Sequence, residues 1–503
     1  MRRASALSIC ALVLAYASVA QGSGVNQLAH FSLVRSLSHG AARVDPYIWK
    51  TKDLSWYHGH YYSTKAPGLA LLTVGPYFAL DRSGVLGVAS RVTGASREAV
   101  ALWLLGLLGA VLPTGALLLL LRRVADQLEP GLGTVTAITA GVCTLLFPFA
   151  TLFFDHALST ALGFAAFAAL WHAGRRLWLV AVSGLLAGFA VTSEYPLALV
   201  AAALGLYAIS RGDYLRRAAA YSAGVAVGVL PLLLYDLWAF GSPFHLSYAD
   251  AIARRGVTGH DVLGQNAPGL FGVSTPNRGV AMHLLFGYIG LITITPVVIA
   301  SAAGVVLLWR KGRRYEAALA AILATAFVVY NSGYKVPFGG GTPGPRFLIP
   351  MLPFLALGFA SAYRAWPWAT LALAVPSGAI MLGVTATNPV QATTWAWVHR
   401  VFDGSFTGAG VGPKLPLAVL LATALFLCAR ITPIARPSAR QAVGAGLALA
   451  GYVVIALAGP RLAGTDPKLL IALFAGVLAA VALWHGARWP HRRGRAAPTP
   501  GPG

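Results

Sequence analysis

The sequence predicts an all-α polytopic membrane protein, built as a bundle of roughly 12–14 transmembrane helices. Composition is the first observation: of 503 residues, 57% are hydrophobic, only 11% are charged, and the mean hydropathy is +0.69. Soluble chains carry about a quarter charged residues. The second observation is that the apolar residues gather in runs of about twenty, the length that a helix needs to cross a bilayer. The third is the placement of the positive charges.

The net charge of +23 is concentrated in short clusters between the apolar runs. Cationic loops of this kind stay on the cytoplasmic side of a membrane, which predicts a plasma-membrane protein with both termini in the cytoplasm. No basic stripe interleaved with aromatic residues occurs, so nucleic acid is not expected as a partner. The clusters are Arg122-Arg123, Arg175-Arg176, Arg216-Arg217, Arg310-Lys311 and Arg492-Arg493.

The first apolar run, 4–21, is either a signal peptide that ends at Ala20 or an uncleaved span, and the charge pattern favours the span. The stretch 66–82 is interrupted by Pro and Gly, which predicts an interfacial segment in a long first outward loop that carries short interfacial helices. The remaining spans are predicted near 99–121, 134–153, 157–173, 177–193, 195–210, 218–240, 282–309, 315–331, 346–363, 367–386, 415–430, 441–459 and 468–486.

These runs divide the chain into a catalytic core over residues 1–365, additional helices over 366–486 with an outward loop near 387–414, and a disordered basic tail over 487–503. The cysteines (Cys10, Cys143 and Cys428) all lie in apolar runs. They show neither a CxxC nor a Cys/His spacing, so the sequence indicates neither a disulfide framework nor a zinc site.

The outward segments are predicted at 22–98, 241–281, 387–414 and 332–345, and long outward loops are where function usually lies. The first is the richest in reactive side chains. Its carboxylates are candidate general bases, its tyrosines can stack on sugar rings, and its lysine can hold a phosphate. The alternative is an amphipathic loop anchored on the membrane by its aromatic residues. The side chains concerned are Asp45, Asp53, His58, His60, Tyr61, Tyr62 and Lys65.

Three further acids lie at or within predicted spans. Asp155, followed by His156, and Glu194 each precede a predicted helix, where an acid either caps the helix or faces a polar cavity. Asp236 lies deeper, inside the span 218–240, and an ionisable group inside a span is a functional candidate.

The segment 330–350 combines Lys335, three consecutive glycines at 339–341 and Arg346. Glycine lets the backbone approach a ligand closely. Arg346 either forks two oxygens of a phosphate or extends to the interface, and Arg278 has the same two interpretations. The glycines follow no predicted strand and lack the Walker pattern, so they do not indicate nucleotide binding.

At these residues the chain resembles the GT-C membrane glycosyltransferases, in particular the bacterial relatives of protein O-mannosyltransferases and the lipid A aminoarabinose transferase. Residues 59–68, Gly-His-Tyr-Tyr-Ser-Thr-Lys-Ala-Pro-Gly, are similar to the family's Gly-x-x-Tyr-x-x-Lys-x-Pro. Asp155, the Phe-Gly-Ser-Pro at 240–243 and the Gly-Pro-Arg-Phe-Leu-Ile-Pro at 344–350 follow in the family's order. The resemblance covers residues 1–365.

The resemblance implies a polyprenyl-phosphate sugar donor, a glycan, lipid or protein acceptor, and a catalytic Asp in the first outward loop. Many relatives carry Asp-Glu soon after the first span, whereas this chain has Asn26-Gln27. Asp53 and Asp45 are the acids that remain, and Asp53 ranks first because it adjoins the Tyr/His/Lys cluster. Asp155 is expected to orient the acceptor or the base.

We expect direct displacement with inversion at the outer face, in which Lys65 and Arg346 meet the charge of the leaving phosphate. No metal is required on this scheme, although a divalent ion is compatible with it. Two other functions fit the composition: a transporter or flippase for a lipid-linked or polar substrate, and a non-catalytic scaffold of envelope assembly. The expected substrate-binding residues are His58, His60, Tyr61, Tyr62, Lys65, His156, Glu194, Asp236, Arg278, Lys335 and Arg346.

Overall fold

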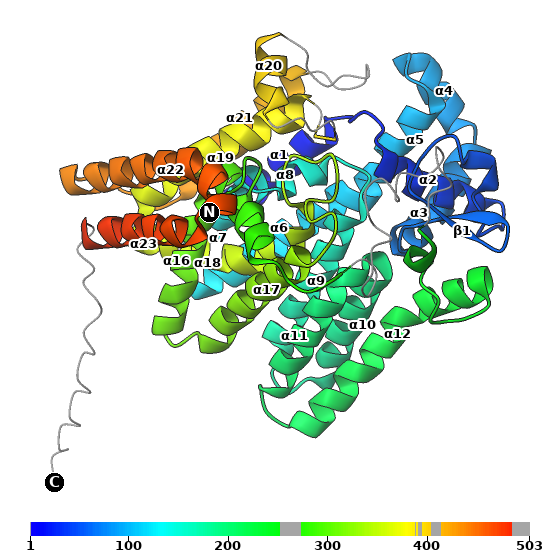
Figure 1. Cartoon of the computed structure of the whole chain (residues 1–503), viewed down its shortest axis with the longest axis horizontal. Coiled ribbons are helices and arrows are strands. Elements are labelled where there is room, and N and C mark those ends of the chain that lie inside the picture. The colour runs from blue at the N-terminus through cyan, green and yellow to red at the C-terminus, as the bar shows by residue number, and fades with distance from the viewer. Residues whose placement is uncertain (1, 252–272, 388, 391–394, 404–413, 485–503) are drawn as a thin grey trace.

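The computed structural model describes residues 2–251, 273–387, 389–390, 395–403 and 414–484. Within these ranges nearly every element is a helix, and the one sheet is a two-stranded hairpin (Figure 1). The predicted all-α class is therefore confirmed. The predicted tail over 487–503 and parts of the predicted outward segments 241–281 and 387–414 lie outside the described residues.

The N-terminal part forms one helix of the bundle and then a compact segment over residues 25–93, which is called the N-terminal segment and which the sequence predicts to face outward. In Figure 1 this segment, in dark blue, lies at the opposite side of the molecule from α22 and α23. The predicted interfacial stretch 66–82 forms α3, which contains Pro76. The elements are α1 (Arg2–Ala17), α2 (Val25–Ser38), η1 (Asp45–Tyr47), β1 (Leu54–Tyr57), β2 (His60–Ser63), α3 (Gly68–Arg82) and α4 (Val85–Thr93).

The Tyr/His/Lys cluster that the sequence shows lies in the β1–β2 hairpin and in the residues directly after it. Leu54 pairs with Ser63 and Tyr57 with His60, and the two-residue turn between the strands has positive φ at His58 (45°) and Gly59 (84°). A two-residue turn of this kind needs positive φ at both positions, which glycine adopts readily and histidine only rarely. Ser63 Oγ donates a hydrogen bond to the backbone oxygen of Ala29 (3.1 Å), which ties the hairpin to α2.

The first half of the bundle surrounds the start of α9. A long helix over Arg97–Leu128 contains a π-helical segment, and the short helices α7 and α8 follow it before α9 begins at Asp155. Its elements are α5 (Arg97–Gly106), η2 (Leu107–Val111), α6 (Leu112–Leu128), α7 (Gly133–Cys143), α8 (Leu146–Ala150), α9 (Asp155–Ala173), α10 (Leu177–Ser193), η3 (Tyr195–Leu197), α11 (Ala198–Ile209), α12 (Tyr214–Phe240) and η4 (Ser247–Asp250).

The second half adds a strongly bent pair of helices and two long peripheral helices, α22 and α23. The chain bends by 94° between Arg278–Ile294 and Val297–Arg310. The elements are α14 (Arg278–Phe286), α15 (Leu291–Ile294), α16 (Val297–Arg310), α17 (Arg314–Ser332), η5 (Arg346–Met351), α18 (Leu352–Ala365), α19 (Pro367–Thr387), α20 (Ala396–Phe402), α21 (Lys414–Ile431), α22 (Ala439–Thr465) and α23 (Pro467–Trp484).

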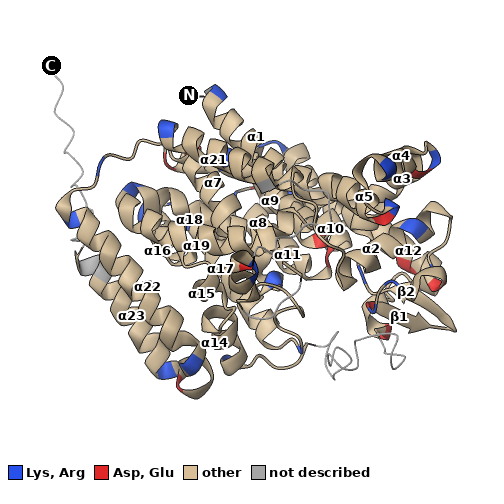
Figure 2. Cartoon of the chain, turned by 90° about the horizontal axis from the view of Figure 1, so that it is seen from above, with Lys and Arg blue, Asp and Glu red and all other residues tan. Residues whose placement is uncertain are grey.

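By length and composition, six helices within the described ranges can cross a membrane, or seven if the bent pair is one span. Shorter apolar helices of 10–17 residues occupy several of the other predicted spans, such as Gly133–Cys143 and Leu177–Ser193. In Figure 2 the ribbon colours for Lys, Arg, Asp and Glu lie mainly at helix ends and in the N-terminal segment, while the middles of α22 and α23 carry none. These features define a membrane protein.

Glycines bring α10 and α12 together at van der Waals distance. A Cβ on Gly184 would lie 2.1 Å from the backbone oxygen of Tyr221, and one on Gly228 would lie 2.3 Å from that of Leu185. Small residues at such a seam allow backbones to approach closely, which is the usual way that helices associate inside a bilayer. This seam fixes the end of α10, where Glu194 follows.

Candidate functional site

A cavity of about 600 Å³ opens between the N-terminal segment and the start of α9. Its wall is drawn from parts of the chain that are far apart in sequence. The lining includes Asn26 from α2; Lys52, Asp53, Thr64 and Lys65 around the hairpin; Asp155, His156, Glu194 and Tyr195 from the bundle; and Tyr248, Tyr330, Tyr334, Gly339, Gly340, Gly341, Arg346 and Phe347 from the later segments.

An ion pair lies on the hairpin side of this cavity. Lys65 Nζ is 2.9 Å from Asp53 Oδ2, and the two side chains are only 11% and 14% exposed. The backbone N–H of Asp53 donates to Thr51 Oγ1 (3.1 Å). Lys65 occupies Oδ2 of Asp53, so this oxygen is less accessible to an acceptor hydroxyl than a carboxylate oxygen without a partner would be.

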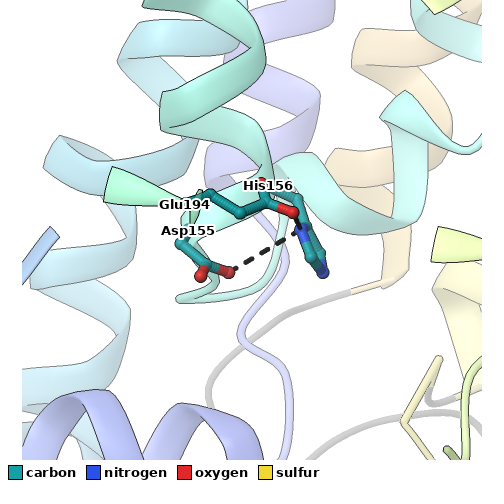
Figure 3. Close-up of side chains that lie close together, drawn as sticks. All are labelled: Asp155, His156 and Glu194. Carbon is teal, nitrogen blue, oxygen red and sulfur yellow. Dashed lines mark hydrogen bonds and ion pairs between the residues drawn. The ribbon is translucent and has the colours of Figure 1, made fainter. Parts of the chain in front are cut away.

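Three buried side chains meet opposite the hairpin, where α9 begins and α10 ends (Figure 3). His156 Nδ1 lies 2.8 Å from Glu194 Oε1 and 3.7 Å from Asp155 Oδ1. Ser159 Oγ donates to the other oxygen of Glu194 at 2.6 Å. Glu194 therefore has a hydrogen-bond partner on both oxygens, whereas Oδ1 of Asp155 has none within the described residues.

Asp155 is also approached from α2, by His30. Nε2 of His30 lies 3.6 Å from Asp155 Oδ2, an ion-pair distance that is too long for a hydrogen bond. Burial raises the pKa of the Asp155 carboxyl, but the neighbouring His30 and His156 outweigh burial and hold this pKa below its ordinary value. Asp155 lies just before the predicted span 157–173, and its carboxylate is ionised at neutral pH.

The same three residues could offer ligands to a metal ion. Asp155, His156 and Glu194 each have one ligand atom within 4.8 Å of those of the other two, and no other group of this kind occurs in the described part of the chain. A carboxylate–histidine–carboxylate set suits zinc or a similar divalent ion. An ion would compete with the bond that already joins His156 to Glu194.

Arg346 supplies positive charge from another wall of the cavity. Its guanidinium lies over the rings of Phe154 (5.4 Å) and Phe347 (5.1 Å), and no carboxylate lies within ion-pair distance among the residues that the structure describes. Its Nε is buried without a hydrogen-bond partner. Gly339 (φ +81°) passes so close that a Cβ there would lie 2.4 Å from this Nε. Arg346 is therefore held in place by packing rather than by an acid.

Tyrosines line the remaining wall. The hydroxyls of Tyr248 and Tyr334 are in contact, which joins η4 to the loop after α17. Burial raises the pKa of both phenols, so both are protonated and able to donate hydrogen bonds at neutral pH. Aromatic rings with a polar tip suit the faces and hydroxyls of a sugar.

Of the residues predicted from sequence, the structure brings Asp53, Lys65, Asp155, His156, Glu194 and Arg346 to this cavity. The other predicted site residues do not line it. Asp45 binds His60 Nδ1 (3.0 Å) and the backbone N–H of Tyr61 (2.7 Å), so it stabilises the hairpin. His58 stacks on Tyr57 with ring centroids 4.0 Å apart, and Tyr62 packs against Phe240.

Asp236, Arg278 and Lys335 also lie away from the cavity wall. Asp236 is fully buried in α12, and neither carboxylate oxygen has a hydrogen-bond partner within the described residues. Arg278 begins α14, and Lys335 is exposed.

The sequence arguments did not single out His30, Tyr195, Tyr248 or Tyr334. The spacing of Asn26 and His30 offered one signal, because residues four apart share a helix face. The tyrosines gave no comparable signal, since their approach to the cavity depends on the tertiary fold.

The chain is thus an all-α polytopic membrane protein with a charged cavity beside the N-terminal segment. No family model matches it, and no curated protein is similar to it in sequence. Among solved structures it is similar to the apo form of the Archaeoglobus fulgidus oligosaccharyltransferase, with 13% sequence identity and a TM-score of 0.44. The alignment covers 88% of this chain and 57% of that one.

Proposed function

We propose that this protein is a GT-C-like membrane glycosyltransferase that moves a sugar from a polyprenyl-phosphate donor to an acceptor hydroxyl at the outer face of the plasma membrane. One observation carries the proposal. A single cavity places Arg346, a cation without an acidic partner among the described residues, together with Asp155, a buried and ionised carboxylate. The phosphate of the donor needs a cation and the hydroxyl of the acceptor needs a base, so the reaction requires both groups.

Arg346 is the better placed of the two predicted phosphate ligands. Its planar guanidinium can donate two parallel hydrogen bonds to phosphate oxygens. Lys65 is engaged by Asp53 at 2.9 Å, so its charge is partly neutralised before any donor binds. We assign the phosphate to Arg346 first, with Lys65 as a second and weaker contact.

Asp155 becomes the preferred base, ahead of Asp53, because its Oδ1 is free to accept a proton and not because it is the more basic group: the neighbouring histidines hold its pKa below the ordinary value. It has no lysine or arginine within ion-pair distance among the described residues, and its Oδ1 accepts no hydrogen bond there. Asp45, which does not line the cavity, serves the hairpin instead.

The reaction is a single displacement. Asp155 takes the proton of the acceptor hydroxyl while the hydroxyl oxygen forms a bond to the anomeric carbon. The bond between that carbon and the phosphate oxygen breaks on the opposite face, and its electron pair leaves with polyprenyl phosphate. Arg346 stabilises the negative charge that develops on this leaving group. No step needs a metal ion, although a divalent ion held by Asp155, His156 and Glu194 would add positive charge to the site.

Purified protein in lipid vesicles tests the proposal against polyprenyl-phosphate sugars that are radiolabelled in the sugar. We expect covalent transfer of label to an acceptor in a membrane extract, with the Asp155→Asn protein as the inactive control. Movement of intact donor across the vesicle without transfer would identify a flippase, and the absence of both would favour a scaffold. Loss of transfer in EDTA, restored by a divalent ion, would contradict the metal-free reaction.

A further inference from the structure

His30 makes an unusual set of contacts for a buried histidine. It is 0% exposed, and neither ring nitrogen has a hydrogen-bond partner in the described part of the chain. Its one ion-pair contact is with Asp155 Oδ2, and its ring meets the edge of Phe153 with centroids 6.2 Å apart. Burying a polar ring without hydrogen bonds costs stability, so His30 does not serve to anchor its own helix.

The position of His30 on α2 connects it to the cavity. Asn26, one helical turn earlier and on the same face, lines the cavity wall and presents an amide that cannot act as a base. His30 lies one turn further along, behind the wall, where it reaches Asp155 across 125 residues of sequence. The helix thus supplies a neutral side chain to the cavity and an imidazole to the carboxylate.

Asp155 has few other groups to fix its orientation. Its second neighbour, His156, lies 3.7 Å away and is already bonded to Glu194 at 2.8 Å. Without His30, Oδ2 of Asp155 would have no ion-pair contact among the described residues, and the carboxylate would be free to turn toward His156. A catalytic group that is misplaced by about 1 Å loses up to about a hundredfold in rate.

We propose that His30 is a positioning residue that holds Asp155 for proton removal from the acceptor. The inference rests on the proposed function, in which Asp155 is the base. His30 itself does not line the cavity, so it does not touch the donor or the acceptor. Its loss therefore acts on kcat, whereas the KM for the donor, which depends on Arg346, stays unchanged.

Three substitutions separate this role from simple packing. Nε2 faces Asp155, and a glutamine amide can occupy that position, whereas an asparagine amide is too short to reach it. We expect kcat per folded protein to fall by about ten- to a hundredfold in His30→Ala and His30→Asn. His30→Gln should recover most of this loss. Ser36→Ala removes another buried, unpartnered polar group from α2 and serves as the control.

A packing role predicts a different pattern. All three His30 variants would then lose thermal stability together, and kcat per folded protein would stay near that of the unmodified protein. That result, or a His30→Gln variant as slow as His30→Ala, would overturn the positioning role.

A stability cycle tests the contact without any assay of activity. If His30 holds Asp155, the fall in Tm of the double variant His30→Ala/Asp155→Asn should be smaller than the sum of the two single falls. Additive shifts would overturn the inference. If the unmodified protein transfers no sugar, the proposed function fails, and this cycle alone decides whether His30 holds Asp155.

Discussion

The two cations that the sequence assigned to phosphate binding differ in their partners. Lys65 is paired with Asp53, whereas Arg346 lies on two phenylalanine rings and has no acid within reach among the described residues. A cation that a carboxylate already neutralises gains less from a phosphate than one that is packed against aromatic rings. Arg346 should therefore contribute more of the binding energy for a lipid phosphate.

Replacement of Arg346 tests this difference. A hydrogen bond to a charged group contributes about 1.5–3 kcal/mol, so Arg346→Ala should weaken donor binding by roughly ten- to a hundredfold. Arg346→Lys keeps the charge but loses the two-pronged geometry and should recover only part of the affinity. Arg278→Ala, which removes an arginine away from the cavity wall, is the matched control. Equal donor affinity in all three variants and the unmodified protein would refute the assignment.

Asp45, Asp53 and Asp155 should respond differently to substitution by asparagine. Removal of a general base typically costs about a hundred- to ten-thousandfold in turnover, so Asp155→Asn should fall in that range. Asp53→Asn should cost less, because Lys65 already occupies Oδ2 of Asp53. Asp45→Asn should act only on the hairpin. The rate of transfer in single-turnover assays with bound donor measures all three effects. A larger loss in Asp53→Asn than in Asp155→Asn would identify Asp53, and not Asp155, as the base.

At the scale of elements, the glycine-rich loop before η5 positions Arg346. Gly339 and Gly340 both have positive φ (81° and 83°), so alanine at either position costs about 1–2 kcal/mol of backbone strain. Only at Gly339 would the new Cβ also meet Arg346, at 2.4 Å from Nε; at Gly340 nothing lies within 4 Å. A comparison of Gly339→Ala with Gly340→Ala therefore separates the effect of backbone strain from the effect of displacing the Arg346 guanidinium.

We expect Gly339→Ala and Gly340→Ala to lower Tm by similar amounts. Both glycines line the cavity, but donor affinity should fall further in Gly339→Ala than in Gly340→Ala, because only the first displaces Arg346. Isothermal titration with a short-chain polyprenyl phosphate measures this difference. Equal affinities in the two variants would mean that the loop does not position Arg346.

The sequence predicted the helical class and most of the charged side chains of the cavity, but not how they pair. The pairing of His156 with Glu194, 38 residues later, depends on how α9 and α10 pack, and no local pattern reports it. The hairpin was not predicted either, because its turn places a histidine at positive φ, which favours glycine or asparagine.

At the scale of the whole molecule, hydropathy located the apolar runs better than it located their breaks. The run 134–153 divides into α7 and α8, and the run 282–309 bends by 94° before α16. Pro296, just before α16, removes a backbone donor and favours such a break. Hydropathy averages over these local effects, so it cannot distinguish one straight span from two short helices that lie within protein.

The proposed chemistry requires the hairpin and α2 to face outward while the arginine clusters face the cytoplasm. In intact cells, a membrane-impermeant thiol reagent should label a cysteine at Trp49, a residue of the N-terminal segment that is 83% exposed. The same reagent should not label a cysteine at Arg175, which is exposed in the loop between α9 and α10, until the membrane is permeabilised. Cys10 is exposed and must first be replaced by serine, whereas Cys143 and Cys428 are buried. Labelling of Arg175→Cys but not Trp49→Cys in intact cells would show the opposite membrane topology, in which the cavity faces the cytoplasm. A polyprenyl-phosphate donor presented at the outer face could not then reach Arg346 and Asp155, so this one reversal would also remove the basis of the proposed transfer.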